Sequence, residues 1–251
     1  MKTIDRRRFL EQANKAGLGL AAAVTVLREP KSVGAAPAND KIVLAAVGAG
    51  GRGSHLAAGF VERGDCEYAY VCDPNQPRAE ALAKSIAAKQ SKPPKIVQDF
   101  RKALDDKSVQ AIVAATPDHW HALAAVWGCQ AGKDVYVEKP ATHSCWEGQK
   151  MVEAARKYKR VVQVGTQNRS AKYNMTAREY IQSGKLGKIH LCRVFNQKIW
   201  GNFPQSKDCD PPKGFDWDMW NGPAPAAHYN PTFLAGWHHL WRYSGGDIAN
   251  D

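Results

Sequence analysis

The 251-residue chain has no Cys-x-x-Cys pair among its six cysteines and no His/Cys spacing typical of a metal site, so a zinc finger or a dithiol redox centre is not indicated. No uninterrupted run of three or more Lys or Arg follows Arg8, which argues against a nucleic-acid-binding arm. No apolar stretch reaches the roughly 20 residues of a membrane span. We therefore expect no metal and no nucleic-acid partner, and we expect the cysteines to be small buried hydrophobic residues.

The formal net charge of +11 is unevenly distributed. Seven Lys or Arg against three Asp or Glu place +4 in the first 38 residues, and later basic residues are interspersed with acidic ones. This pattern favours a solvated basic surface over a cationic patch for DNA or acidic polysaccharide. A composition of 44% hydrophobic and 24% charged residues is typical of a folded globular protein, with room for one large or two modest domains.

Residues 1–38 resemble a twin-arginine signal peptide. Arg6 and Arg7 precede a mildly apolar stretch at residues 16–27, and residues 36–38 read Ala-Pro-Ala, an Ala-x-Ala cleavage site. The alternative is an ordinary amphipathic first helix, but two glycines within the apolar stretch would weaken a helix. We expect export to the periplasm and a mature protein that does not associate with a membrane after signal cleavage.

A glycine-rich stretch at residues 48–53 reads Gly-Ala-Gly-Gly-Arg-Gly, the Gly-x-Gly-x-x-Gly pattern. It follows a short apolar run at residues 42–47, typical of a buried strand, and precedes apolar residues at helical spacing over residues 54–61. The pattern predicts a strand, a tight turn and a helix. In that context it is a site for the pyrophosphate of a dinucleotide, whose charge the helix N-terminus would favour.

The three glycines of this pattern have separate expected roles. Gly48 makes the turn, Gly50 lets the backbone approach the phosphates, and Gly53 lets helix and strand pack closely. Asp73 lies twenty positions after Gly53, at the end of a second apolar run, where its carboxylate can accept hydrogen bonds from the adenosine ribose. Asp73 favours NAD over NADP because a carboxylate repels a 2′-phosphate, and Arg78 is the nearby group that would soften this preference.

Strand and helix patterns alternate through residue 165, which predicts a doubly wound parallel sheet over residues 39–165 with helices on both faces. Asp118 is expected to cap one helix, and Ser144 with Glu147 fits a capping box for another. Expected strands after the first lie at residues 68–72, 96–97, 109–115, 134–137 and 161–164, and expected helices lie at residues 76–89, 118–131 and 144–157.

Ligands of such a sheet bind beyond the carboxyl ends of its strands, where residues 116–121 and 138–140 fall. Lys139 at a strand tip can share a proton with a substrate hydroxyl while hydride leaves the carbon. The plain alternative is a charged surface turn. Pro140 would fix the backbone there, in either a trans or a cis peptide. His119 and His121 lack a third metal ligand nearby, so they are expected to bond locally or to the cofactor.

The glycine motif, Asp73, residues 116–121 (Thr-Pro-Asp-His-Trp-His), residues 138–140 (Glu-Lys-Pro) and residues 165–168 (Gly-Thr-Gln-Asn) resemble, in this order and spacing, the glucose-fructose oxidoreductase and inositol dehydrogenase family. The resemblance covers residues 41–251. It implies a Rossmann domain followed by an α/β domain with an open, mostly antiparallel sheet that receives substrate, of which residues 166–251 would be the first part. It also implies a homo-oligomer.

Carried over by position, the resemblance assigns roles to individual residues. The catalytic residues would be Lys139 and Glu138. The residues expected to contact the cofactor are Gly48, Gly50, Arg52, Gly53, Asp73, Thr116, Pro117, His121, Glu138 and Gln167. The residues expected near the substrate are Lys139, Asn168, Arg169, His238, His239 and Asn250.

The second half of the chain is less regular. Residues 171–183 are expected to form a helix and residues 189–197 a strand. Several tryptophans follow among glycines and prolines, and they suit sugar stacking and the pinning of irregular backbone about equally. The family generally places a His after a glycine pair such as residues 245–246, and none follows it before Asp251. We expect either a fragment of a longer protein, with that His beyond Asp251, or a truncated product that lacks part of its site.

Three functions follow from these expectations. The first is oxidation of a sugar or cyclitol hydroxyl with NAD, which is tightly bound because a periplasm offers no pool to refill from. The second is redox-neutral, an NAD-retaining glycoside hydrolase or epimerase in which hydride returns to the product. The third is a non-catalytic carbohydrate-binding relative.

Overall fold

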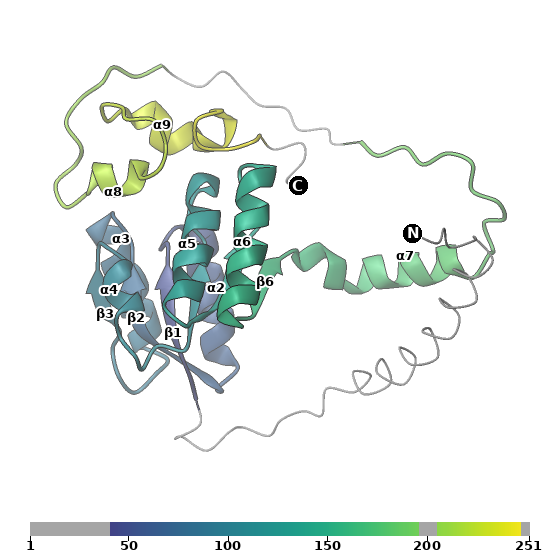
Figure 1. The fold of residues 1–251 in the computed structure, drawn as a ribbon, viewed down its shortest axis with the longest axis horizontal. Helices are drawn as coiled ribbons and strands as arrows, with labels where there is room; N and C mark the ends of the chain where they lie inside the picture. Colours follow the sequence, from purple (N-terminus) through teal and green to yellow (C-terminus); the bar gives the residue numbers. More distant parts are fainter. Residues whose placement is uncertain (1–40, 196–204, 247–251) are drawn as a thin grey trace, which may run out of the picture. The chain divides into compact units, whose positions relative to one another are not determined.

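The computed structural model describes residues 41–195 and 205–246 (Figure 1). The predicted signal peptide, Asn250 and the end of the predicted strand at residues 196–197 lie outside the described residues. The strand, turn and helix expected around the glycine motif are confirmed. The strand before the motif is β1 (Ile42–Val47), and the helix that begins within the motif is α2 (Gly51–Glu62).

Six parallel strands form one sheet within the described residues, in the order β3-β2-β1-β4-β5-β6. This order is that of the Rossmann fold, in which the ligand crevice opens where the strand order reverses, between β1 and β4. The predicted parallel sheet is therefore confirmed. The strands are β1 (Ile42–Val47), β2 (Cys66–Cys72), β3 (Lys95–Val97), β4 (Ala111–Ala114), β5 (Asp134–Glu138) and β6 (Val162–Gly165).

The helices that connect these strands cover both faces of the sheet (Figure 1). Ser144 and Glu147 form the capping box expected at the start of α6. The helices are α2 (Gly51–Glu62), α3 (Gln76–Ala87), α4 (Arg101–Leu104), α5 (Asp118–Gln130), α6 (Cys145–Tyr158), α7 (Lys172–Gln182), α8 (Trp217–Asn221) and α9 (Pro231–Gly236), with short 3₁₀ turns η2 (Gln167–Ser170) and η3 (Trp237–His239).

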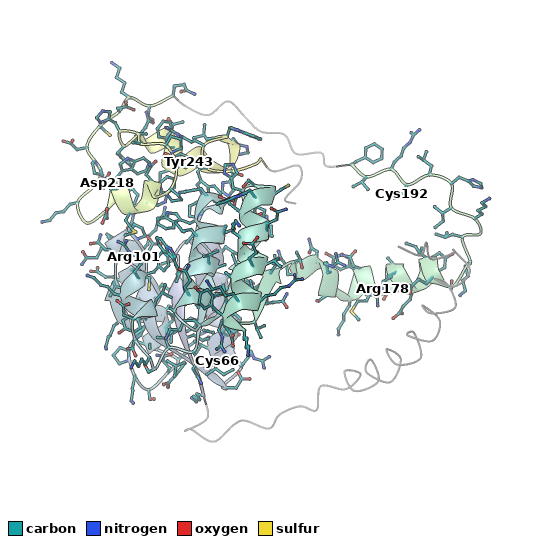
Figure 2. All side chains as sticks on the ribbon, viewed as in Figure 1. Cys66, Arg101, Arg178, Cys192, Asp218 and Tyr243 are labelled. Atoms are coloured by element: carbon teal, nitrogen blue, oxygen red, sulfur yellow. The ribbon has the colours of Figure 1, made fainter. Side chains whose placement is uncertain are left out.

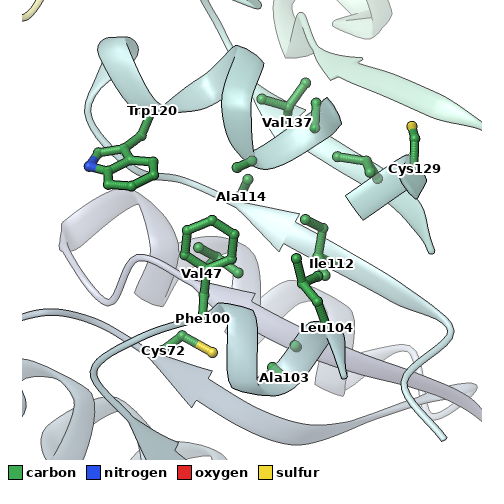
Figure 3. Close-up of a cluster of buried hydrophobic side chains, with 14 of the residues drawn as sticks. Val47, Cys72, Phe100, Ala103, Leu104, Ile112, Ala114, Trp120, Cys129 and Val137 are labelled. Atoms are coloured by element: carbon green, nitrogen blue, oxygen red, sulfur yellow. The ribbon is translucent and has the colours of Figure 1, made fainter. Parts of the chain in front are cut away.

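Alternation along the strands divides the core into two layers. Ala45 and Val47 of β1 pack with α4, α5 and α6 on one face (Figure 3), whereas Leu44 and Ala46 pack with α2 and α3 on the other. Because successive side chains of a strand point to opposite faces, one continuous apolar run fills both layers. The sheet is thus buried on both sides, which leaves its carboxyl edge as the place where polar groups gather.

The prediction of a strand at residues 189–197 is wrong for residues 189–195, the part that the structure describes. Residues 189–195 have no regular structure, and Leu191, Val194 and Phe195 are exposed. A strand needs a neighbour to pair its backbone groups, and no described strand pairs with this segment. The antiparallel sheet of a second domain is accordingly not seen in residues 166–195 and 205–246, although the helix expected at residues 171–183 is present as α7.

A third apolar cluster lies within residues 205–246. Trp217 and Trp220 stack with ring centroids 4.9 Å apart. Tyr243, labelled in Figure 2, is fully buried in the same cluster. Trp217 pins irregular backbone, one of the two interpretations left open by the sequence, because its indole N–H donates to the Ala227 carbonyl oxygen. Sugar stacking by the other tryptophans stays a prediction. Trp241, by contrast, is 81% exposed.

The expectation that the cysteines are buried holds for Cys66, Cys72 and Cys129 but is wrong for Cys145, Cys192 and Cys209, which are exposed. Cys145 begins a surface helix, and the other two lie in segments without strands to cover them. Among the described residues no helix is both long and apolar enough to cross a membrane.

Candidate functional site

A cavity of about 590 Å³ lies at the carboxyl ends of β1, β4 and β5. It brings together residues that are far apart in the sequence. Of the residues expected near a cofactor or substrate, those that line it are Gly48, Gly50, Arg52, Asp73, Thr116, Pro117, His121, Glu138, Lys139, Gln167 and His238.

The glycine loop has the geometry that a phosphate cradle needs. Gly48 has φ +96°, and a Cβ there would lie 2.6 Å from the Ala115 carbonyl oxygen. Gly53 does not line the cavity. A Cβ on Gly53 would overlap the Gly48 carbonyl group, so the absence of a side chain there allows α2 to pack on the loop. A Cβ on Gly50 would meet nothing within 4 Å. Gly50 therefore faces open space, where a ligand's phosphates can approach the backbone.

The start of α2 supplies hydrogen-bond donors to this cradle. The helix is 12 residues long, Gly50 is its N-cap, and no side chain caps it or places a negative charge in its first turn. The first N–H groups of a helix lack partners within the helix and carry the positive end of its dipole. An anion such as a pyrophosphate fits these groups.

Asp73 holds the glycine loop in place through hydrogen bonds to the backbone. Its carboxylate accepts hydrogen bonds from the backbone N–H groups of Ala49 (2.7 Å) and Asn75 (2.8 Å). Burial raises the pKa of Asp73, and the two hydrogen bonds and the positive charge of Arg78 oppose this rise. A carboxylate has about four acceptor positions, so further positions remain for ribose hydroxyls on the side that lines the cavity.

Glu138 joins the glycine loop to the lysine motif. Arg52 in α2 donates to its carboxylate from Nε (2.7 Å) and Nη2 (2.6 Å), and the Lys139 backbone N–H donates at 3.2 Å. Glu138 is buried, whereas about a third of the Arg52 side chain is exposed. These bonds make Glu138 a brace that fixes Lys139 relative to the glycine loop.

Lys139 follows β5 and precedes Pro140 through a cis peptide bond. Asp118 lines the same cavity and is buried, and it accepts a hydrogen bond from the Ser244 hydroxyl (2.7 Å). Burial raises the pKa of Asp118, opposed by that hydrogen bond and by the positive charges of His121, Lys139 and His143. The ammonium of Lys139 is thus close enough to act electrostatically on this carboxylate.

The expected cap at Asp118 is wrong. Pro117 is the N-cap of α5 and no side chain caps the helix, because the Asp118 carboxylate is turned to Ser244. Sequence reasoning did not identify Asp118 as a site residue. Its position beside the Thr-Pro pair at a strand end was the available signal, since such positions gather at the carboxyl edge of the sheet.

His121 connects the loops that follow β4 and β5. Its Nδ1 lies 2.6 Å from the Pro140 carbonyl oxygen and its Nε2 lies 2.8 Å from that of Thr116. Only a doubly protonated ring donates to both oxygens. His121 lines the cavity as expected, but both of its ring nitrogens face the protein.

His119 has a structural position. Its Nε2 lies 3.1 Å from the Trp220 carbonyl oxygen, and burial lowers its pKa to about 4. Its Nδ1 is buried without a hydrogen-bond partner among the described residues. A neutral ring with the proton on Nε2 satisfies the Trp220 carbonyl.

Some residues expected at the site do not lie there. Asn168 and Arg169 are exposed in η2 and do not line the cavity, and His239 does not line it either. His238 does, and its ring stacks on Trp237 at 3.5 Å between centroids. The described residues contain no group of three or more His, Cys, Asp or Glu that could hold a metal ion.

Comparisons with known proteins support the interpretation of this cavity. Residues 42–166 match the Gfo/Idh/MocA family, described as an oxidoreductase family with an NAD-binding Rossmann fold. The chain is 31% identical over 123 residues to inositol 2-dehydrogenase of Salmonella paratyphi B, covering 49% of this chain and 35% of the relative. It is 27% identical over 168 residues to a glycosyl hydrolase family 109 protein of Shewanella putrefaciens, covering 59% of this chain and 36% of the relative.

Among solved structures, a dehydrogenase from Bordetella pertussis in complex with NADH and UDP-GlcNAcA is similar, with a TM-score of 0.55 and 26% identity. The alignment covers 60% of this chain and 44% of that one. The part of this chain that aligns therefore covers between 35% and 44% of the length of these similar proteins.

Proposed function

We propose, on the premise that the Rossmann domain of residues 42–166 belongs to the Gfo/Idh/MocA family of NAD-binding oxidoreductases, that the whole protein oxidises a hydroxyl group of a sugar or cyclitol. The observation that carries the proposal is that Lys139 lines the same cavity as the glycine loop and Asp73. A proton-transfer group therefore faces the space in which a dinucleotide fits.

The residues present fit NAD. The open space at Gly50 and the uncapped start of α2 would hold the pyrophosphate, and Asp73 would bind the adenosine ribose. A buried carboxylate at that position disfavours the 2′-phosphate of NADP. Arg78 lines the cavity too, and its charge reduces this preference.

When bound, NAD would supply the hydride acceptor for the carbon that carries the substrate hydroxyl. Lys139 Nζ takes the hydroxyl proton as a general base and returns it in the reverse direction. Glu138 and His121 position Lys139 through its backbone and through Pro140, respectively. The buried Asp118 carboxyl group lines the same cavity, and the positive charge of Lys139 opposes the rise in the pKa of Asp118 that burial causes.

The test is a Lys139→Met variant of the full-length protein, with Lys133→Met as the control. Lys133 lies away from the cavity and donates to the Asp106 carbonyl oxygen. We expect the Lys139 variant to bind NAD as the wild type does and to lose at least about a hundredfold in turnover of inositols or sugars. Full turnover in this variant would refute the assignment.

A second candidate function is favoured by the similarity to a glycosyl hydrolase family 109 protein. In a redox-neutral reaction, transient oxidation of one hydroxyl acidifies a neighbouring C–H, the glycosidic bond is eliminated, water adds and the hydride returns. No external electron acceptor is needed. Aryl glycosides added without nucleotide distinguish the two: aglycone release supports this candidate, and reduction of added NAD by a free sugar supports the first.

We further propose that the protein is exported through a twin-arginine signal, works as a homo-oligomer in the periplasm, and carries a second domain with an open antiparallel sheet. Support for export comes from Arg6, Arg7 and the Ala-x-Ala site at residues 36–38. An Arg6→Lys/Arg7→Lys variant that still reaches the periplasm would contradict export by this route, and a monomer in sedimentation would contradict the oligomer.

A further inference from the structure

Residues 214–244, here called the strap, contact the Rossmann domain at two places, each beside residues that line the cavity. The first place is the turn after β2, next to Asp73. There the Gln76 N–H donates to the Gly214 carbonyl, and the Asp216 N–H donates to the Pro74 carbonyl, both at 2.9 Å. Phe215 forms an antiparallel bridge with Asn75. This end of the strap lies where the adenosine ribose would bind.

The second place is the start of α5, next to Lys139 in the cavity lining. The Trp220 carbonyl accepts from the Trp120 indole N–H at 3.0 Å and from His119 at 3.1 Å. The His119 backbone N–H donates to the Tyr243 carbonyl at 3.2 Å. The Ser244 hydroxyl donates to the buried Asp118 at 2.7 Å, so both ends of the strap are hydrogen-bonded.

Between these places the strap is packed rather than loose. Its aromatic cluster is buried, and the Tyr243 hydroxyl donates to the Asn221 side chain at 2.8 Å. The strap also contributes part of the cavity lining, namely Met219, Trp220, Leu234, Ala235, Trp237 and His238. It lies outside the segment that matches the family, residues 42–166.

We propose that the strap retains the dinucleotide: NAD enters and leaves the cavity only when the contacts at one end of the strap break. The proposal rests on the proposed function for the identity of the ligand. It supplies a physical cause for a cofactor that stays bound, because exit then requires the loss of the hydrogen bonds at one end of the strap, which are buried at the α5 end, in addition to the cofactor's own contacts. Such a barrier slows entry as much as exit.

Two variants loosen the strap at positions that do not themselves line the cavity. Ser244→Ala removes the hydrogen bond to Asp118. Gly222→Ala places a methyl group where it would overlap the Trp120 indole, at a backbone φ of +48°. His228→Ala, an exposed position in the same segment, is the matched control. The second variant keeps the test valid if either strap variant fails to fold, which circular dichroism reports.

The experiment measures binding and release of NADH by stopped-flow energy transfer from tryptophan, using the full chain. We expect both strap variants to release NADH at least about tenfold faster than the wild type, about 1.4 kcal/mol, and to bind it faster too. The control should match the wild type. Unchanged rates of NADH binding and release in folded strap variants would overturn the proposal that the strap retains the dinucleotide. Faster release without faster association would overturn it too.

The outcomes separate this proposal from the proposed function. If the strap variants bind and release NADH at wild-type rates and Lys139→Met loses turnover, only the strap proposal is overturned. Fast exchange in both strap variants with undiminished turnover in Lys139→Met supports the strap and overturns the assigned chemistry. A wild-type chain that binds no NADH overturns both.

Discussion

The pKa of His119 provides a direct test of how the strap is anchored. The folded chain protonates His119 only near pH 4, whereas the ordinary value is 6.5. Between these values the unfolded chain binds a proton that the folded chain does not, so the folded state loses stability as the pH falls from 6.5 towards 4. Above pH 6.5 both states are neutral and this group has no effect.

The magnitude follows from the width of that window. Each pH unit within it is worth about 1.4 kcal/mol, so lowering the pH from about 7.5 to about 4.5 reduces the free energy of unfolding by about 2.5 kcal/mol through His119. Burial raises the pKa of Asp73 and Asp118, and those groups act in the opposite direction. A variant comparison at both pH values removes their contribution.

The variant is His119→Gln, whose amide N–H can reach the Trp220 carbonyl but does not titrate. Urea unfolding, followed by tryptophan fluorescence at both pH values, should show the wild type losing about 2.5 kcal/mol more than the variant on acidification. Equal losses in the two proteins would refute the reasoning, because they would mean that His119 titrates alike in the folded and unfolded states.

Other predictions concern the glycine loop and its braces. Gly53→Ala should abolish NAD binding and lower the free energy of unfolding by more than about 3 kcal/mol, because the new Cβ overlaps the Gly48 carbonyl. Gly59→Ala is the control, since Gly59 is exposed in the same helix with nothing near its Cβ. This variant should raise the free energy of unfolding by about 0.5–1 kcal/mol. Urea unfolding and fluorescence titration check both, and equal effects would contradict the steric argument. Arg52→Ala should lower the free energy of unfolding by about 1–3 kcal/mol, because the buried Glu138 loses its main donor. Adding Glu138→Gln should recover part of this loss. Strictly additive effects of the two substitutions on unfolding would contradict an energetic interaction between Arg52 and Glu138. Asp73→Asn should weaken NAD binding at least about tenfold and narrow the preference over NADP, and titration with both nucleotides would detect an unchanged preference.

The nucleotide-binding half of the protein was largely predictable from sequence, because its signals are local. The apolar run before Gly48 predicts a strand buried on both faces, and the glycine spacing requires a turn that only residues without a Cβ allow. The capping box at Ser144 and Glu147 involves residues three apart. These patterns depend on neighbours along the chain, so they can be read without knowing the fold.

Predictions failed where a residue's partner is distant. The segment at residues 189–195 has the composition of a strand but no described strand beside it. Asp118 looks like a helix cap, yet its partner Ser244 is 126 positions away. Composition does not reveal which of several acceptors a side chain will choose, since that choice depends on burial and on which segments meet.

The sequence by itself determined the doubly wound sheet, the phosphate cradle and the positions of Asp73 and Lys139 at strand ends. Backbone conformation and the periodicity of burial are properties of short segments, and they set these features. Only the tertiary structure decided that Arg52 pairs with Glu138, 86 positions away, that both nitrogens of His121 face carbonyl oxygens, and that six residues of the strap line the cofactor cavity. Those features arise from packing, which brings distant segments within hydrogen-bond distance and removes the water that would otherwise compete for the same groups.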